Sequence, residues 1–172
     1  MKRFTLFMIL IMMGVHHVTA QQLNNDLNPS EYFDFWIGQW ELSWESADGT
    51  IGKGTNNIEK ILNGKVIKEN FEATKGSLSG YVGKSYSVYD TKTEQWKQTW
   101  VDNQGTYLDF VGSFIENKRI FKRKTTNADG KTIIQRMVFY DIKKDSFTWR
   151  WEKSRDNGNN WEIMWKIAYR RH

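Results

Sequence analysis

The segment EQWKQTWVD, residues 94–102, alternates aromatic and polar side chains in a way that could form a binding site. At the two-residue period of a strand, one side carries Trp96, Gln98, Trp100 and Asp102. If that side is buried, the Gln98 amide needs a hydrogen-bonding partner, which a bound polar group or an ordered water would supply. The segment therefore predicts a cavity wall that could hold an organic molecule with a polar end.

Side chains of the common catalytic and metal-binding sites are scarce. The chain has no cysteine, and its three histidines are His16, His17 and His172. A Ser-His-acid triad, a zinc site and a histidine-ligated haem would each lack residues that they need. We therefore expect no cofactor and no metal, and no residue can be assigned as catalytic from its spacing.

The first twenty residues predict a secretory signal peptide. A short basic start, Lys2 and Arg3, is followed by an apolar run over residues 4–15 and by the small-residue pattern VTA at residues 18–20. The apolar run is short for a transmembrane helix, although an uncleaved membrane anchor is the alternative interpretation. We expect cleavage after Ala20, export to the periplasm or the extracellular space, and no stable membrane insertion afterwards.

The charge of the chain gives no reason to expect a nucleic acid partner. Removing Lys2 and Arg3 from the 25 basic residues leaves 23 against 20 acidic residues, so the remaining chain has a net charge of about +3. Basic residues are interleaved with acidic ones except in residues 118–124, which a solvated strand face explains.

The region after residue 31 is predicted to form one all-β domain, residues 32–172, preceded by a polar lead-in over residues 21–31. Turn residues such as Asp48-Gly49 recur at short intervals between runs that are rich in aromatic and β-branched residues. This pattern predicts an antiparallel β-sandwich or barrel. About ten strands are expected, at residues 39–46, 51–62, 65–73, 82–89, 94–101, 106–115, 118–125, 131–140, 146–153 and 161–171.

Asn63-Gly64 predicts a two-residue type I′ turn, which fixes the register of the hairpin around it. Paired residues then have numbers that add to 127, so Glu69 faces Ile58 and lies on the inward side of the sheet. Lys60 is its diagonal neighbour on that side. Because a buried charge needs a partner or water, either Lys60 and Glu69 meet, or the interior is wet there, or Lys60 extends to the rim.

Alternation in the last two strands also places tryptophans on the inward side. In residues 146–153 the inward set includes Trp149 and Trp151. In residues 161–171 it consists of Trp161, Ile163, Trp165, Ile167 and Tyr169. The chain's nine tryptophans, if exposed, would form more apolar surface than soluble proteins usually carry, so most must be core or cavity wall.

The segment PSEYFDFWIGQW, residues 29–40, predicts a short helical turn that closes one end of the barrel. Ser30 is the expected N-cap, and the turn extends to about Ile37. Gly38 ends the turn before Trp40 begins an inward alternation. The wide spacing of the tryptophans here thus reflects two elements that meet, and it does not indicate one helical stripe.

Four longer segments together resemble a family of exported bacterial domains of unknown function that is thought to be lipocalin-like. They are FDFWIGQWEL, NNIEKILNGKVIKENF, GKSYSVYDTKTEQWKQTWVDNQG and DNGNNWE, and the resemblance spans about residues 33–170. Arg136 and Trp161 also fall where the family has an arginine and a tryptophan. The resemblance implies an antiparallel lipocalin-like β-barrel and no established activity.

The lipocalin resemblance also implies a structural role for three residues at the barrel floor. In lipocalins a Gly-x-Trp motif places its tryptophan over the floor, and a basic residue from the end of the last strand packs on it. Gly38 and Trp40 supply the motif here. Arg171 is the expected partner of Trp40, rather than Arg170, because it shares a side with the inward Tyr169.

Three functions are compatible with these observations. The first is a binding protein that holds a small amphipathic or hydrophobic molecule inside its barrel. Its expected ligand-binding residues are Lys60, Glu69, Gln98, Trp100, Arg136, Trp149, Trp151 and Trp165. The second is an enzyme that uses a buried carboxyl or tyrosine without histidine, with candidates Glu69, Asp109, Tyr86 and Tyr107. The third is a surface-interaction module whose barrel is filled by side chains.

Overall fold

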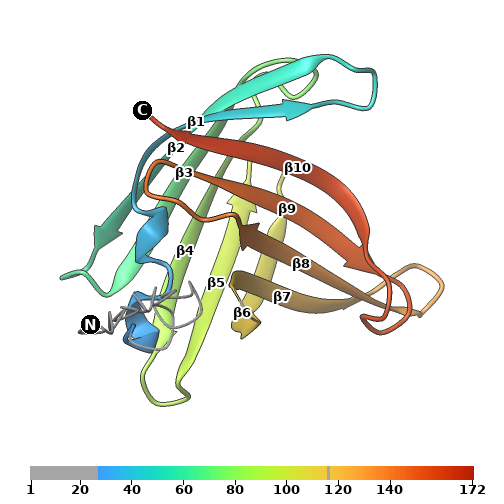
Figure 1. Ribbon diagram of the computed structural model, residues 1–172. Coiled ribbons are helices and arrows are strands. Elements are labelled where there is room, and N and C mark those ends of the chain that lie inside the picture. Colours follow the sequence, from blue (N-terminus) through green and yellow to red (C-terminus); the bar gives the residue numbers. More distant parts are fainter. Residues whose placement is uncertain (1–26, 116) are drawn as a thin grey trace, which may run out of the picture.

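Ten antiparallel strands form a closed barrel in the computed structural model, which describes residues 27–115 and 117–172 (Figure 1). The strands are β1 (Gly38–Glu45), β2 (Ile51–Ile61), β3 (Val66–Lys75), β4 (Val82–Asp90), β5 (Gln95–Asp102), β6 (Tyr107–Ile115), β7 (Lys118–Thr126), β8 (Thr132–Tyr140), β9 (Ser146–Ser154) and β10 (Glu162–Arg171). Each strand pairs with the next, and β1 closes the ring by pairing with β10. The all-β fold and the ten strands predicted from the sequence are confirmed.

The predicted signal peptide and most of the lead-in lie outside the described residues. Within the part of the chain that the structure describes, no helix combines the length and the apolar character that crossing a membrane requires.

Two short 3-10 helices, η1 (Pro29–Glu31) and η2 (Asp34–Trp36), close one end of the barrel. The N-cap of η1 is Asn28, whose Oδ1 accepts hydrogen bonds from the backbone N and the Oγ of Ser30. The predictions of one continuous turn and of Ser30 as its cap are therefore wrong. Proline favours the first helical position, so the residue before Pro29 becomes the cap.

Aromatic rings fill the closed end of the barrel. Phe33, between the two short helices, is fully buried, and its ring stacks on that of Phe121 with the centroids 4.4 Å apart. Trp36 meets Phe139 edge to face at a centroid distance of 5.2 Å. We call this layer the aromatic floor; it consists of Phe33, Trp36, Trp40, Phe121, Phe139 and Phe147.

The hairpin of β2 and β3 has the predicted register. Glu69 pairs with Ile58 and Lys60 pairs with Ile67, so the numbers of paired residues add to 127 as expected. The turn itself contains three consecutive residues with positive φ, which is one more than a two-residue type I′ turn requires: Leu62, Asn63 and Gly64. The register places the Glu69 side chain inside the barrel, where it is 5% exposed.

Strand β10 departs from strict alternation near its start. A register shift between Ile163 and Trp165 puts one extra residue in β10 opposite β9. Ile163 pairs with the outward Glu152 and is half exposed, whereas Ile167 and Tyr169 are buried inside the barrel. The prediction that Trp161 and Ile163 belong to the inward set is wrong. The bulge reverses the alternation on its N-terminal side, and Trp161 packs against Arg136 on the outer face.

The barrel is split between β6 and β7 at the end opposite the aromatic floor. The register between these strands runs from Ile115 paired with Lys118 to Val111 paired with Lys122. Among the described residues, 107–110 of β6 and 123–126 of β7 have no register partner in the other strand. Figure 1 shows the two strands diverging along this stretch. The interior therefore approaches the surface at the split.

Candidate functional site

A cavity of about 370 Å³ lies inside the barrel, between the aromatic floor and the open end. Its wall contains five indole rings. Four come from three strands, Trp100 of β5, Trp149 and Trp151 of β9 and Trp165 of β10, and the fifth is Trp36 of η2. The rings of Trp149 and Trp165 meet edge to face, with their centroids 5.8 Å apart. Side chains therefore do not fill the barrel completely.

Five of the eight predicted ligand-binding residues line this cavity, namely Glu69 and the four strand tryptophans, whereas Trp36 was not predicted to do so. Gln98 lies inside the barrel on the side of Trp100, but it belongs to a layer behind the cavity wall. Its Nε2 donates a hydrogen bond to the Oγ of Ser87 at 2.9 Å. The NH₂ group of this buried amide therefore already has a hydrogen-bond acceptor within the protein.

Lys60 does not reach Glu69. It lies near the end of β2, where its Nζ is 2.6 Å from the Oδ2 of Asp34 in η2. Both side chains remain about one third exposed. Of the three arrangements considered from the sequence, extension to the rim is the one observed. Asp34 supplies a counter-ion there that stays partly in water, which costs less free energy than a pair inside the barrel.

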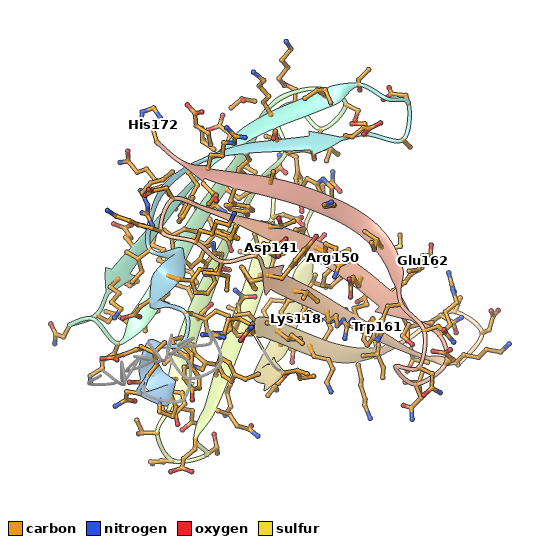
Figure 2. The ribbon with its side chains drawn as sticks, in the orientation of Figure 1. Lys118, Asp141, Arg150, Trp161, Glu162 and His172 are labelled. Atoms are coloured by element: carbon orange, nitrogen blue, oxygen red, sulfur yellow. The ribbon has the colours of Figure 1, made fainter. Side chains whose placement is uncertain are left out.

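Arg136 lies on the outer face of the barrel, so its predicted place in the ligand site is wrong. Its Nε is 2.6 Å from the Oε2 of Glu152, and its guanidinium covers the ring of Trp161 at 3.5 Å. Arg150 approaches the other oxygen of Glu152 at 3.0 Å, on the part of the barrel where Figure 2 labels Arg150 and Trp161. Alternation along β8 turns the neighbouring Gln135 inward and leaves Arg136 outside.

Hydrogen bonds link buried polar side chains of β2, β3, β4 and β5 beside the cavity. The Oε1 of Glu69 accepts from the Nδ2 of Asn56 at 2.7 Å, and its Oε2 accepts from the Oγ of Ser85 at 2.6 Å. Gln98 extends this polar chain by donating to Ser85 and Ser87. Complete burial raises the pKa of Glu69 to about 7, although both hydrogen bonds oppose the rise. Glu69 therefore changes its charge near neutral pH.

Asp102 carries the charge at the open end of the cavity. Its Oδ2 accepts hydrogen bonds from the hydroxyl of Tyr81 at 2.8 Å and from the Nε1 of Trp100 at 3.1 Å. Its Oδ1 accepts from the backbone N of Gln104 and of Thr106. Desolvation raises the pKa of Asp102, but these hydrogen bonds outweigh it and hold the pKa at about 2. The carboxylate is thus ionised and fully supplied with donors.

Arg123 and Gln135 also line the cavity, and the sequence interpretation missed both. The Nη1 of Arg123 donates a hydrogen bond to the Oε1 of Gln135 at 2.6 Å. The prediction that residues 118–124 form a solvated face is wrong for the first part of the strand, because Arg119, Ile120 and Phe121 are all buried. The apolar Phe121 two places before Arg123 was the available signal, since residues two apart share a face.

Glu69 is the one acid–base candidate that lies inside the barrel. The other three, Asp109, Tyr86 and Tyr107, are exposed on the outer face of β4 and β6. No water-excluding pocket surrounds them, so burial does not adapt them to acid–base catalysis. In residues 27–115 and 117–172, no group of three or more histidine, aspartate or glutamate residues is placed to hold a metal ion.

A broader depression of about 750 Å³ crosses the outside of β1 to β5. Polar side chains such as Thr55, Asn57 and Asn70 line it, and the C-terminal His172 lies at its edge, at the end of β10 (Figure 2). It is larger than the interior cavity but lies on the outer surface of the sheet. We assign the candidate site to the interior, because enclosure and aromatic walls favour the binding of a small molecule.

Neither a protein-family model nor a curated protein sequence matches this chain. Among solved structures, the chain is similar to a redesigned β-barrel. The two are 8% identical in sequence, the match covers 83% of this chain and 96% of that one, and the TM-score is 0.42.

Proposed function

We propose that this protein is an exported, lipocalin-like barrel that binds a small amphipathic or hydrophobic organic molecule. The cavity of about 370 Å³, with five tryptophans in its wall, carries the proposal. Proteins hold small molecules in apolar cavities of this size, and indole rings give a large contact area to a guest. The ionisable side chains of Glu69, Asp102 and Arg123 also line the cavity and could bind the polar end of an amphipathic ligand.

Binding can be tested with N-phenyl-1-naphthylamine, a neutral aromatic dye that becomes fluorescent in apolar surroundings. We expect saturable binding to the purified protein and quenching of its tryptophan emission. Trp100→Ala should weaken dye binding, because this ring forms part of the cavity wall. The matched control is Trp161→Ala, which removes a ring from the outer face and should leave binding unchanged. Absence of saturable binding, or equal losses in the two variants, would contradict the proposal.

Export is supported by the pattern of the first twenty residues. The full-length chain should be expressed in a bacterial host and recovered from the periplasm or the medium. Its intact mass should match a chain that begins at Gln21, allowing for loss of ammonia when the new terminal glutamine cyclises. A full-length product in the membrane fraction would contradict cleavage and release.

A further inference from the structure

We infer that the molecule held in the barrel is an organic carboxylate whose head group binds Arg123 while its apolar part lies among the tryptophans. This inference rests on the proposed binding function and adds the chemical class of the ligand. It depends on which polar groups around the cavity already have partners, on the charge of Arg123, and on the position of Arg123 at the split in the barrel.

Among the described residues of the cavity wall, the buried side-chain polar atoms without a partner are all hydrogen-bond donors. Among the described residues that line the cavity, three buried nitrogen atoms have no hydrogen-bond partner: Nε1 of Trp36, Nε of Arg123 and Nε1 of Trp165. Indole and guanidinium groups donate and cannot accept. Each of these three atoms is itself covered by protein, so the spare donors show the polarity of the wall and do not mark contact points for a ligand. A ligand that carries oxygen acceptors therefore fits this wall.

The acidic side chains of the same cavity have no comparable need for a ligand. Both oxygens of Glu69 accept hydrogen bonds from Asn56 and Ser85, and Asp102 accepts four from its surroundings. Among the described residues, the buried side-chain acceptors without a partner are Asp34 Oδ1, Asn56 Oδ1 and Gln98 Oε1, and none of these residues lines the cavity. A cationic ligand would thus find each carboxylate oxygen already bonded to at least one neutral donor, so charge alone would attract it.

Arg123 brings a positive charge to the cavity without a carboxylate partner among the described residues. Its Nη1 donates a hydrogen bond to the neutral Gln135, and the ring of Phe110 lies 6.0 Å from its guanidinium carbon. A half-buried charge is costly unless an opposite charge accompanies it. The two oxygens of a carboxylate match the forked donors of a guanidinium, which gives the strongest class of hydrogen bond.

Arg123 also lies where a ligand could reach the cavity from outside. A depression of about 260 Å³ at the split between β6 and β7 is lined by Arg123 and Phe110, which also line the interior cavity. Lys122 and Lys124 stand on its outer side, together with Asp109. The two lysines give this approach a net positive charge, which favours an anion.

Competition with the neutral dye tests the inference. Decanoate, decanol and decylamine share one apolar chain and differ in the charge of the head group. At about pH 8, decanoate should displace N-phenyl-1-naphthylamine at a concentration roughly 10- to 100-fold lower than decylamine, the ratio that one charge-assisted interaction gives. Arg123→Met should weaken displacement by decanoate by a similar factor and should leave displacement by decanol nearly unchanged.

Lys84→Met is the matched control, because it removes one exposed positive charge from the outer face of β4. This variant should keep the wild-type ranking of decanoate, decanol and decylamine by the concentration needed to displace the dye. If the wild type binds no dye, the proposed function fails and the carboxylate inference fails with it. If the dye binds but decanoate is no better than decylamine, or Arg123→Met does not affect it, only the carboxylate inference is overturned. If Arg123→Met does not fold, the concentrations at which decanoate, decanol and decylamine displace the dye from the wild type still test the carboxylate inference.

Discussion

The guanidinium of Arg171 lies over the indole of Trp40, with its central carbon 4.3 Å from the ring centroid. The Nη1 of Arg171 donates to the backbone oxygen of Ile37 at 3.1 Å, and the Nε1 of Trp40 donates to that of Trp36 at 2.8 Å. The last strand, the first strand and the closing segment therefore meet at one contact. This is the arrangement that the Gly-x-Trp motif and the position of Arg171 implied.

Trp40→Ala should lower the free energy of unfolding by roughly 3–5 kcal/mol, the range for deleting a large buried aromatic side chain. Arg171→Ala should cost less, because this side chain is partly exposed. The double mutant should lose less than the sum of the two, since the residues are in contact. Urea unfolding of the four proteins measures this coupling, with the exposed Arg170→Ala as the control. Strict additivity would contradict a stabilising contact.

Gly38→Ala should destabilise the protein more than an alanine at a glycine in a turn. Gly38 has a φ of +139°, a conformation that other residues rarely adopt, and a Cβ there would collide with the Nη1 of Arg171. Gly130→Ala is the control, because its φ is +76° but no atom lies within 4 Å of the added Cβ. In an Arg171→Ala background, part of the Gly38→Ala cost should disappear. Equal costs in both backgrounds, by urea unfolding, would show that no collision occurs.

Glu69→Gln should remove a pH dependence of stability. The pKa of Glu69 is about 7 in the folded chain against a reference of 4.5, so the folded chain holds a proton that the unfolded chain has released. Glu69 therefore contributes its full stabilisation at a pH below its pKa in the unfolded chain. This contribution, about 3 kcal/mol in total, is lost as the pH rises through the pKa of Glu69 in the folded chain.

Unfolding in urea at about pH 5 and about pH 8 measures this loss. The wild type should lose more stability than Glu69→Gln over that interval, and the variant should be the more stable of the two at the higher pH. Glu59→Gln is the matched control, because Glu59 is a partly exposed residue that pairs with Lys68 on the outer face. A wild-type loss that survives in Glu69→Gln would assign the pH dependence to other groups.

Zinc, haem and a chelator should each leave the melting temperature unchanged. The chain has no cysteine, and the described residues place no group of three or more potential ligands together. A ligand that binds the native state raises the melting temperature by mass action, so thermal unfolding at excess zinc or haem is a sensitive check. A reproducible shift would point to a site built from carboxylate oxygens.

The strand register of the β2–β3 hairpin could be predicted because two independent signals agree there. The Asn63-Gly64 turn fixes the pairing, and the period-two pattern fixes the side that is buried. The inward Glu69 follows from these two signals. The hydrogen-bond partners of Glu69 could not be predicted in the same way, since Asn56 and Ser85 approach it only when three strands are placed together.

The position of Arg136 could not be predicted because both faces of β8 carry apolar residues. Ile133 and Ile134 are neighbours on opposite faces, and both are buried. Alternation then separates the two faces but does not indicate which one is inside. The outer face is covered locally by Arg136, Arg150 and Trp161, whose packing buries Glu152. Arg123 was missed for a related reason, because the charges around it resemble a solvated strand.

The split between β6 and β7 leaves two strand edges with unpaired backbone groups, and such edges can recruit a strand from a second copy of the chain. Lys122 and Lys124 project beside this edge on β7, and lysines at an edge oppose that kind of self-association. Substitutions that neutralise these lysines should therefore promote polymerisation at high protein concentration. The opening that would admit a ligand is therefore also an edge at which two copies of the chain could join.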